Sequence, residues 1–325
     1  MKKYLLAILF LGIYLFSFEL QASPLKLGVL APDGTSWSTS LRQMAKEIEA
    51  KTAGRVQFKT YFGGSQGDEG DVLKKIRIGQ LHGGFFTGKT VGELSSDVRV
   101  IELPFMFGAD NKRAMNALDK VEKTLGKGFE KAQLKCLGLY GLGFVYFVSQ
   151  KKFSDLESLK GMKIWTWDGD KISMTMIDSL NLASVSLALP DVLSALSTGM
   201  LSATYAPPMA IVALQWNSKI KYLLDYPLAY AMGAFLIDQK EWNKISLQDQ
   251  KVFQEIATTT LRKITADNEK ENVDALLSMK NMGVEFMRLP EKDLKQVDQI
   301  KNKVIGRLKG TFISPQAIQL VEGTK

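Results

Sequence analysis

The chain has 325 residues, of which 46% are hydrophobic and 23% charged, a composition typical of a globular protein of about two domains. Its single His and single Cys exclude a His/Cys zinc cluster, a Cys-x-x-Cys redox pair and a disulfide framework. The net charge of +8 is moderate, and Lys and Arg are dispersed rather than clustered with aromatic residues, so nucleic-acid binding has no support. We expect no metal and no cofactor.

The first 22 residues have the pattern of a secretory signal peptide. Lys2 and Lys3 precede an apolar run from Tyr4 to Phe18, and Ala22 is a small residue suited to cleavage. We therefore expect a periplasmic protein without a lipid anchor, because no Cys follows the run. The alternative is an uncleaved membrane anchor, but this run is shorter than the ~20 residues that a membrane span needs.

Strands and helices alternate along the rest of the chain. Leu25 to Leu30 alternates weakly and predicts a strand, and Asp33, Thr35 or Ser36 could cap a helix that ends at Gly54. Further strands are expected at 55–62, 83–88, 134–150, 163–167, 185–189 and 222–238, and further helices at 68–80, 171–180 and 190–198. This alternation predicts an α/β architecture with a mainly parallel sheet.

The segment from Leu247 to Met282 contains neither Pro nor Gly and predicts one very long helix, or two in series, able to brace two lobes. Two α/β sets, export and the missing catalytic groups together predict a hinged binding protein with its ligand in the interdomain cleft. We expect the signal peptide at 1–22, domain I at 23–146 plus 233–250, domain II at 147–232, the bracing helix at 247–283, and a C-terminal segment at 284–325 that packs on the lobes.

Six short motifs accompany this long helix, in a fixed order. They are Gly54-Arg-Val, Gly64-Ser-Gln-Gly67, Arg77-Ile-Gly-Gln80, Leu103-Pro-Phe-Met-Phe107, Asp155-Leu-Glu-Ser-Leu-Lys-Gly-Met-Lys-Ile164 and Ala195-Leu-Ser-Thr-Gly199. Together they resemble the periplasmic solute-binding receptors of tripartite ATP-independent periplasmic (TRAP) transporters, of the dicarboxylate-receptor type. The resemblance spans nearly the whole mature chain. It implies a two-lobed periplasmic-binding-protein fold with a long connecting helix.

The same resemblance implies a non-enzymatic receptor that passes its ligand to a permease of two membrane subunits. One subgroup of these receptors is associated with tetratricopeptide-repeat partner proteins, which the resemblance allows, although no motif of this chain indicates one.

The chain departs from the family at three ligand-contacting positions. The family places an Arg, which pairs with a substrate carboxylate, directly after its Lys-Ile, and this chain has Trp165 there. A second position that is frequently basic is Val145, and the position of a ligand-contacting Asn is Ala206. The resemblance therefore points to an atypical branch that lacks the carboxylate-binding Arg.

These replacements predict a change of ligand. A guanidinium binds both oxygens of a carboxylate at once, and a buried carboxylate without that partner loses about 3–5 kcal/mol. A Trp offers a large apolar face instead. We expect a hydrophobic or amphipathic ligand, such as a lipid, a fatty acid or an isoprenoid-like molecule. The family topology places further apolar residues around the cleft: Trp167, Phe144, Tyr205, Phe86, Trp37, Met209 and Met232.

Other interpretations stay open. The aromatic and Met residues could be ordinary core, and Lys163 or Lys171 could replace the missing Arg, which would keep a small organic anion as the ligand. An exported hydrolase or isomerase would need carboxylates such as Asp33, Asp168 or Asp170, and a structural protein would bind no ligand. Asp168-Gly169-Asp170 lacks the remaining ligands of a calcium loop, so we expect a solvated turn there.

Overall fold

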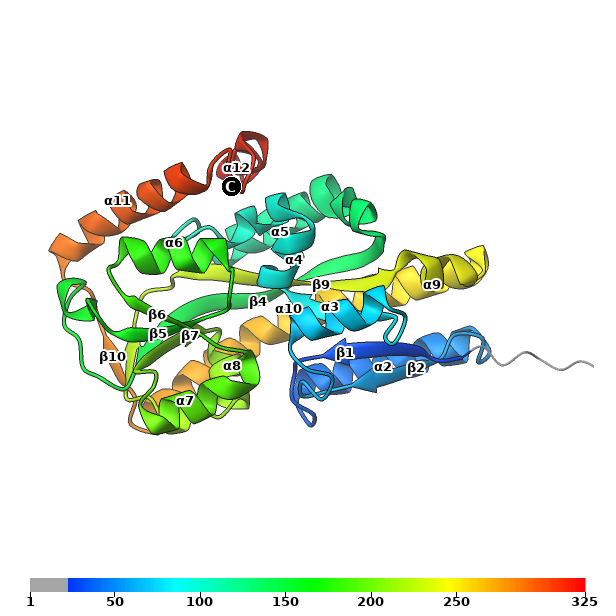
Figure 1. Ribbon diagram of the computed structural model, residues 1–325, viewed down its shortest axis with the longest axis horizontal. Coiled ribbons are helices and arrows are strands. Elements are labelled where there is room, and N and C mark those ends of the chain that lie inside the picture. The colour runs from blue at the N-terminus through cyan, green and yellow to red at the C-terminus, as the bar shows by residue number, and fades with distance from the viewer. Residues whose placement is uncertain (1–22, 325) are drawn as a thin grey trace, which may run out of the picture.

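The computed structural model describes residues 23–324, so the predicted signal peptide at 1–22 lies outside the described residues. A single mixed sheet passes through the molecule, and helices cover it (Figure 1). Its strand order is β2-β1-β3-β9-β4-β7-β5-β6, with β8 on β4 and β10 on β8. The strands are β1 Leu25–Val29, β2 Phe58–Tyr61, β3 Gly83–Thr87, β4 Leu134–Ser149, β5 Lys163–Thr166, β6 Ala183–Ser186, β7 Ala203–Ala206, β8 Tyr222–Leu224, β9 Ala229–Asp238 and β10 Glu285–Met287.

The helices follow the strands in alternation over most of the chain. The α-helices are α2 Ser36–Lys51, α3 Glu69–Arg77, α4 Gly88–Leu94, α5 Asn111–Leu125, α6 Lys171–Ser179, α7 Val192–Thr198, α8 Pro208–Ala213, α9 Gln239–Lys244, α10 Leu247–Asn281, α11 Glu291–Leu308 and α12 Pro315–Glu322. Short 3-10 helices are η1 Ser96–Glu102, η2 Gly126–Ala132, η3 Glu157–Leu159, η4 Leu189–Asp191 and η5 Trp216–Ser218.

The sheet has two halves that meet at β4. Up to Val145, β4 pairs with β9, and from Tyr146 onward it pairs with β7 and β8. We call the half with β1, β2, β3 and β9 lobe 1, and the half with β5, β6, β7, β8 and β10 lobe 2. The two-lobed α/β fold is therefore confirmed, with β4 as a strand common to both lobes.

The expectation of a mainly parallel sheet is wrong at the centre of the molecule. The pairs β1–β2, β1–β3, β5–β6, β5–β7 and β8–β10 are parallel. Every antiparallel pair involves β4 or β9, the two long strands in the middle of the sheet. The reason is that β9 brings the chain back to lobe 1 beside β3 and in the opposite direction, a return that the local sequence pattern does not encode.

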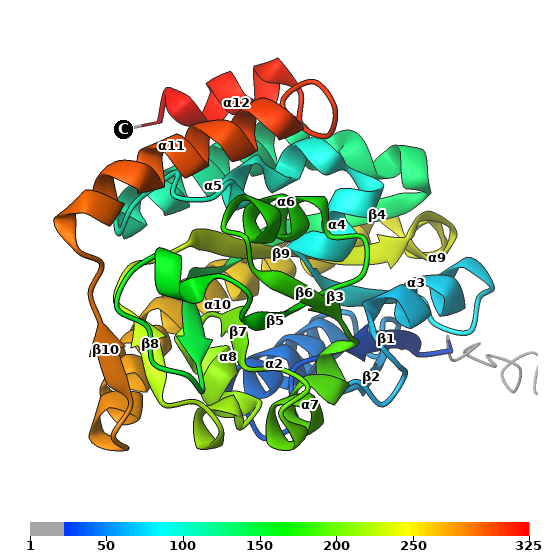
Figure 2. The same ribbon diagram turned by 60° about the vertical axis from the view of Figure 1, so that its left-hand side comes forward.

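The long segment after residue 247 forms one helix of 35 residues, α10, which Ser246 caps through the backbone N–H of Asp249. Helix α10 packs against α2 in lobe 1, against β4, and against α8 in lobe 2 (Figure 2). It buries Phe253, Leu261 and Met279 along its length. One rigid element therefore contacts both lobes. Its many charges fit the finding that, within residues 23–324, no helix has the length and apolarity needed to cross a bilayer.

Helix caps bring two segments of lobe 1 to the junction of the lobes. Of the three caps that the sequence allowed for α2, Thr35 is the one used, and its Oγ1 accepts from the backbone N–H of Ser38 at 3.1 Å. Asp68 caps α3 through the backbone N–H of Glu69 at 2.9 Å. Helix α2 thus follows β1 and α3 follows β2, each after a short loop that ends at the capping residue.

Candidate functional site

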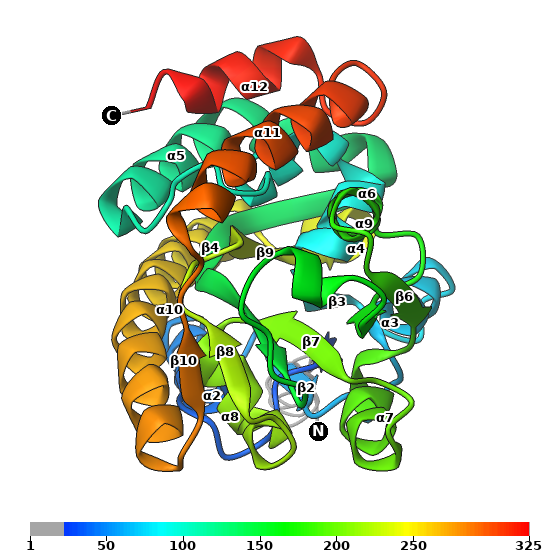
Figure 3. The same cartoon turned by 90° about the vertical axis from the view of Figure 1, so that its left-hand side faces the viewer.

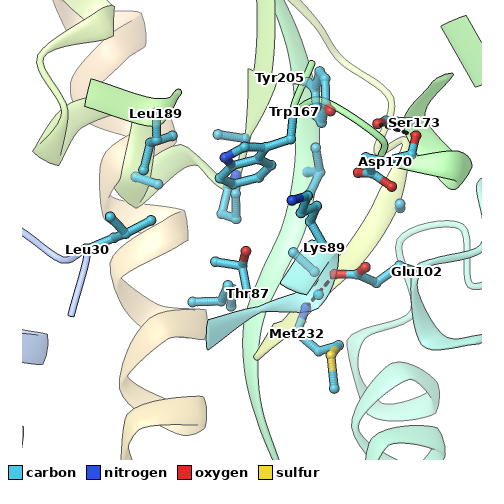
Figure 4. Close-up of a pocket in the computed structure, with 18 of the residues that line it drawn as sticks. Leu30, Thr87, Lys89, Glu102, Trp167, Asp170, Ser173, Leu189, Tyr205 and Met232 are labelled. Atoms are coloured by element: carbon cyan, nitrogen blue, oxygen red, sulfur yellow. Dashed lines mark hydrogen bonds between the residues drawn. The ribbon is translucent and has the colours of Figure 1, made fainter. Parts of the chain in front are cut away.

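A cavity of about 180 Å³ lies between the two lobes. Figure 4 shows Trp167 and Lys89 in the middle of this cavity, with Asp170 and Glu102 on one side and Leu30 and Leu189 on the other. Most of the surface that its walls expose is apolar. Lobe 1 contributes residues such as Leu30, Trp37, Phe85, Thr87 and Met232, and lobe 2 contributes Trp165, Trp167, Leu189, Tyr205, Ala206 and Met209. We refer to this cavity as the cleft pocket.

The sequence-predicted residues are mostly found in this lining. Trp165, Val145, Ala206, Trp167, Tyr205, Trp37, Met209 and Met232 all line the cleft pocket. Phe86 and Phe144 do not. In β3, Phe85 and Thr87 contribute to the lining while Phe86, on the opposite face, is fully buried in the core. Phe144 alternates with Val145 in the same way and packs edge-on against Tyr230 at 5.3 Å.

Trp165 belongs both to the pocket wall and to the core of lobe 2. Its side chain is almost fully buried, and its Nε1 donates to the backbone oxygen of Leu187 at 3.0 Å. Its ring centroid lies 4.5 Å from that of Trp167 and 5.5 Å from those of Tyr205 and Trp216. Trp165 thus anchors an aromatic cluster at the position where the family resemblance implies an Arg, and the pocket and core interpretations of this residue are compatible.

Neither of the lysines considered as replacements reaches the cleft pocket. Lys163 and Lys171 are exposed and absent from the lining, and Lys171 lies over the ring of Phe312 with its Nζ 5.3 Å from the centroid. Lys89 was not among the predicted site residues, but it lines the pocket at the start of α4. Its Nζ lies 2.7 Å from Glu93 Oε1, one helical turn further on.

A buried ionic cluster forms one side of the pocket; it consists of Arg99, Glu102 and Asp170. Arg99 Nε donates to Glu102 Oε2 at 2.6 Å, and its Nη1 donates to Asp170 Oδ1 at 2.5 Å. Glu102 Oε1 also accepts from the backbone N–H of Met232 at 3.1 Å. One cation therefore serves two carboxylates, and its guanidinium is occupied by groups of the chain itself.

The charges within this cluster shift each other's pKa. Burial opposes the charge of Arg99, but Asp170 and Glu102 outweigh that effect and raise the pKa of the guanidinium. Burial likewise opposes the charge of Asp170, yet Arg99 holds the pKa of this carboxyl below its usual value. For Glu102 burial dominates and raises the pKa. Arg99 and Asp170 therefore each favour the charged form of the other.

The expectation of a solvated turn at residues 168–170 is wrong for its last residue. Asp168 is exposed, but Asp170 is only 4% exposed. Besides pairing with Arg99, Asp170 caps α6 by accepting from the backbone N–H of Ile172 at 3.2 Å. The ion pair joins residues 71 positions apart, which no local motif signals. Among the carboxylates considered for a hydrolase, Asp33 and Asp168 lie outside the lining, so no acid pair forms there from that set.

Glu69 is a second buried acid in the lining. It accepts from the backbone N–H of Thr87 at 2.7 Å and from the Thr87 hydroxyl at 3.0 Å. Burial raises the pKa of Glu69 to about 7, and the hydrogen bonds from Thr87 limit the rise. Counting Glu69, the described lining contains three acids and two cations, Lys89 and Arg99, each of which is paired with a carboxylate of the chain.

Comparison with known proteins decides the family. The model of "Bacterial extracellular solute-binding protein, family 7" (DctP) matches residues 27–309, which is most of the chain. The chain belongs to this family. The match confirms the resemblance to TRAP receptors, and with it a solute-binding role for this family 7 receptor.

Individual relatives are distant. An uncharacterized protein of Haemophilus influenzae is 26% identical over 214 residues, which cover 65% of this chain and 64% of that relative's own length. A TRAP periplasmic solute-binding protein of Desulfovibrio salexigens, solved with orotic acid, has a TM-score of 0.83 at 19% identity and covers 93% of this chain and 98% of its own. The sugar acid binding protein DctPAm of Advenella mimigardefordensis, solved with galactonate, has a TM-score of 0.85 at 18% identity. The match covers 93% of this chain and 97% of that protein's chain. At such identities the similarity shows a common fold.

Proposed function

We propose that this family 7 receptor serves a TRAP-type transporter and binds a small, largely apolar solute in the cleft pocket. The observation that carries the proposal is the apolar wall at the three positions where the family resemblance implies polar contacts. Trp165, Val145 and Ala206 all belong to the lining, and both lining cations are paired with carboxylates of the chain. A ligand carboxylate would therefore lose its hydration without gaining a free cation.

The volume of the cavity favours a small ligand over a long-chain lipid. An apolar cavity of about 150 Å³ accommodates one benzene molecule, and the cleft pocket measures about 180 Å³. A single ring with a short substituent matches this size, whereas a long acyl or isoprenoid chain would extend beyond the cavity. Within residues 23–324, the buried Nε1 of Trp37 has no hydrogen-bond partner. It offers a donor to an uncharged acceptor on such a ligand.

A second candidate is a receptor for a small organic anion. The solved neighbours that hold orotic acid and galactonate favour it, because both ligands are acids. Within this chain the cation for such a ligand would be Lys89, rather than Lys163, because Lys89 lines the pocket. Its Nζ would have to leave Glu93 Oε1, which lies 2.7 Å away. Because the ion pair with Glu93 is lost when Lys89 binds the ligand, this candidate is less favoured than an apolar ligand.

The remaining assignments follow from the receptor role. We expect the loaded receptor to dock on the membrane permease subunits of a TRAP system in the periplasm, without catalysing a reaction on its solute. No surface on the described residues argues for a tetratricopeptide-repeat partner, so none is proposed.

Isothermal titration calorimetry tests the proposal, because it measures the binding of both probes without relying on the emission of Trp37, Trp165 and Trp167 in the pocket wall. Indole serves as an uncharged probe and D-glucuronate as an acidic one. We expect indole to bind more tightly, and Ala206→Phe, which fills the pocket, to weaken its binding by at least about tenfold. Ala183→Phe on the exposed face of β6 is the matched control and should leave the affinity unchanged. Tighter binding of D-glucuronate, abolished by Ala206→Phe, would establish the second candidate instead.

Native mass spectrometry of the protein purified without added ligand gives an independent readout. We expect a bound adduct that organic solvent releases and that carries no acid group. An adduct identified as a sugar acid would contradict the apolar proposal.

A further inference from the structure

The buried ionic cluster joins the two lobes. Arg99 lies on η1, which packs against α4, α5 and β9 in lobe 1. Asp170 is the N-cap of α6, which packs against β5 and β6 in lobe 2. Between them Nη1 lies 2.5 Å from Oδ1, and Nη2 lies 3.4 Å from Oδ2. The two nitrogens at the end of the Arg99 guanidinium thus face the two oxygens of an acid from the other lobe.

Arg99 is held on lobe 1 independently of this contact. Its Nε is bound by Glu102, and Glu102 is fixed in turn by the backbone N–H of Met232 in β9. The glycine at position 88 makes room for the Glu102 carboxylate, because a Cβ at that position would collide with the carboxylate oxygens. When the lobes separate, Arg99 therefore stays with lobe 1 and its Nη atoms lose their partner.

We propose that Asp170 acts as a built-in substitute for a ligand carboxylate, so that the Arg99–Asp170 pair closes the cleft without a charge from the solute and excludes carboxylate ligands from Arg99. The exclusion of acids rests on the proposed function above, while the closing role rests on the ion pair alone. A guanidinium that binds two parallel carboxylate oxygens is saturated in that direction. The solute then contributes only apolar contacts in the pocket. The protein itself supplies both partners of the ion pair that holds the lobes together.

Removing the Asp170 carboxylate tests both roles. Asp170→Ala leaves the Arg99 Nη atoms without a partner and opens a space the size of a small carboxylate. In the ligand-free protein, small-angle X-ray scattering should show a larger radius of gyration for Asp170→Ala than for the wild type, and added formate should restore the wild-type value. Asp168→Ala is the matched control, because Asp168 is exposed in the turn just before Asp170 and lies outside the pocket lining.

Benzoate and benzamide are probes of nearly equal shape that differ in charge. Relative to the wild type, Asp170→Ala should bind benzoate at least about tenfold more tightly, without a comparable gain for benzamide. Asp170→Asn preserves the helix cap and the shape of the side chain, so its scattering curve should shift in the same direction even where the alanine variant folds poorly.

The proposal is overturned if neither Asp170 variant changes the ligand-free scattering curve, or if the ratio of benzoate to benzamide affinity stays within about twofold of the wild-type ratio. These outcomes differ from a failure of the proposed function. If wild-type protein prefers D-glucuronate to indole, the apolar ligand is refuted and the exclusion of acids falls with it. The scattering of the Asp170 variants still decides whether the pair closes the lobes.

Discussion

Glu69 shows how one buried acid makes stability depend on pH. Its folded-state pKa of about 7 lies above the ordinary value of 4.5, because burial disfavours the charged form. The folded protein therefore binds this proton more tightly than the unfolded chain. The contribution to stability is fully present below pH 4.5 and is lost as the pH rises through about 7, for a total on the order of 3 kcal/mol.

Glu69→Gln should remove this dependence, since an amide can still accept from the backbone N–H of Thr87. The melting temperature of the variant minus that of the wild type should be larger at pH 8 than at pH 5, by on the order of 5 °C. Glu130→Gln, at an exposed position, is the control, and its melting temperature should match that of the wild type at both pH values. A Glu69→Gln difference that is the same at pH 5 and pH 8 would show that Glu69 is charged throughout this range.

At this scale the sequence predicted the apolar lining well and the buried charges poorly. Trp165, Val145 and Ala206 were predicted because a family motif fixes their positions along the chain. Arg99 and Asp170 were missed because their pairing joins two lobes, and nothing near either residue indicates its partner. The short-range pattern at 168–170 resembled a surface turn, and only the fold determines which of its acids is buried.

Among the elements, β4 and α10 are connected by side-chain hydrogen bonds at the point where β4 passes between the lobes. Irregular pairing with β9 occurs between Gly141 and Gly143, where backbone groups leave the regular ladder. Asn268 Nδ2 donates to the backbone oxygen of Gly141 at 2.8 Å, and Asn272 Nδ2 donates to that of Leu142 at 2.9 Å. Gly143 has a positive φ of 101°, and a Cβ there would collide with the Asn272 amide.

Asn272 also reaches the pocket wall, because its Oδ1 accepts from the backbone N–H of Met209 at 3.0 Å. Asn272→Ala would leave this N–H and the oxygen of Leu142 unpaired. We expect the free energy of unfolding in urea to fall by about 2–3 kcal/mol. Asn281→Ala, at the exposed end of α10, should change it by less than about 0.5 kcal/mol. Equal effects of the two substitutions would mean that water replaces the lost hydrogen bonds.

Helix positions were predictable where apolar spacing and caps coincide, as in α2, α3 and α10. The antiparallel strands at the centre were not, because strand direction depends on how the chain returns between lobes. Helix α5 was not predicted, although its sequence carries a signal: Ala114, Ala117, Leu118 and Val121 are buried at helical spacing behind the Asp110 cap. The polar residues of α10 that hydrogen-bond to β4 also lie on one face of the helix. They could not be predicted from apolar spacing, because they are not apolar.

In the whole molecule several elements belong to both lobes. Strand β4 pairs with β9 on one side and with β7 and β8 on the other, and α10 packs on both lobes. The C-terminal helices add a third connection, with α12 against α5 and α11 against α6 (Figure 3). Ser314 donates to Asp97 in lobe 1, and Asp293 accepts from Leu156 in lobe 2.

These shared elements predict that the lobes unfold together, although chains with two lobes often unfold in steps. Trp37→Phe with Trp242→Phe removes the Trp emission of lobe 1 and leaves that of Trp165, Trp167 and Trp216 in lobe 2. In a urea titration we expect this emission and the far-ultraviolet circular dichroism of the whole chain to change at the same midpoint. Unfolding of lobe 2 alone would expose one side of β4 and of α10 to water, so it costs stability in both lobes. Separate midpoints would show instead that the lobes unfold independently although they share β4.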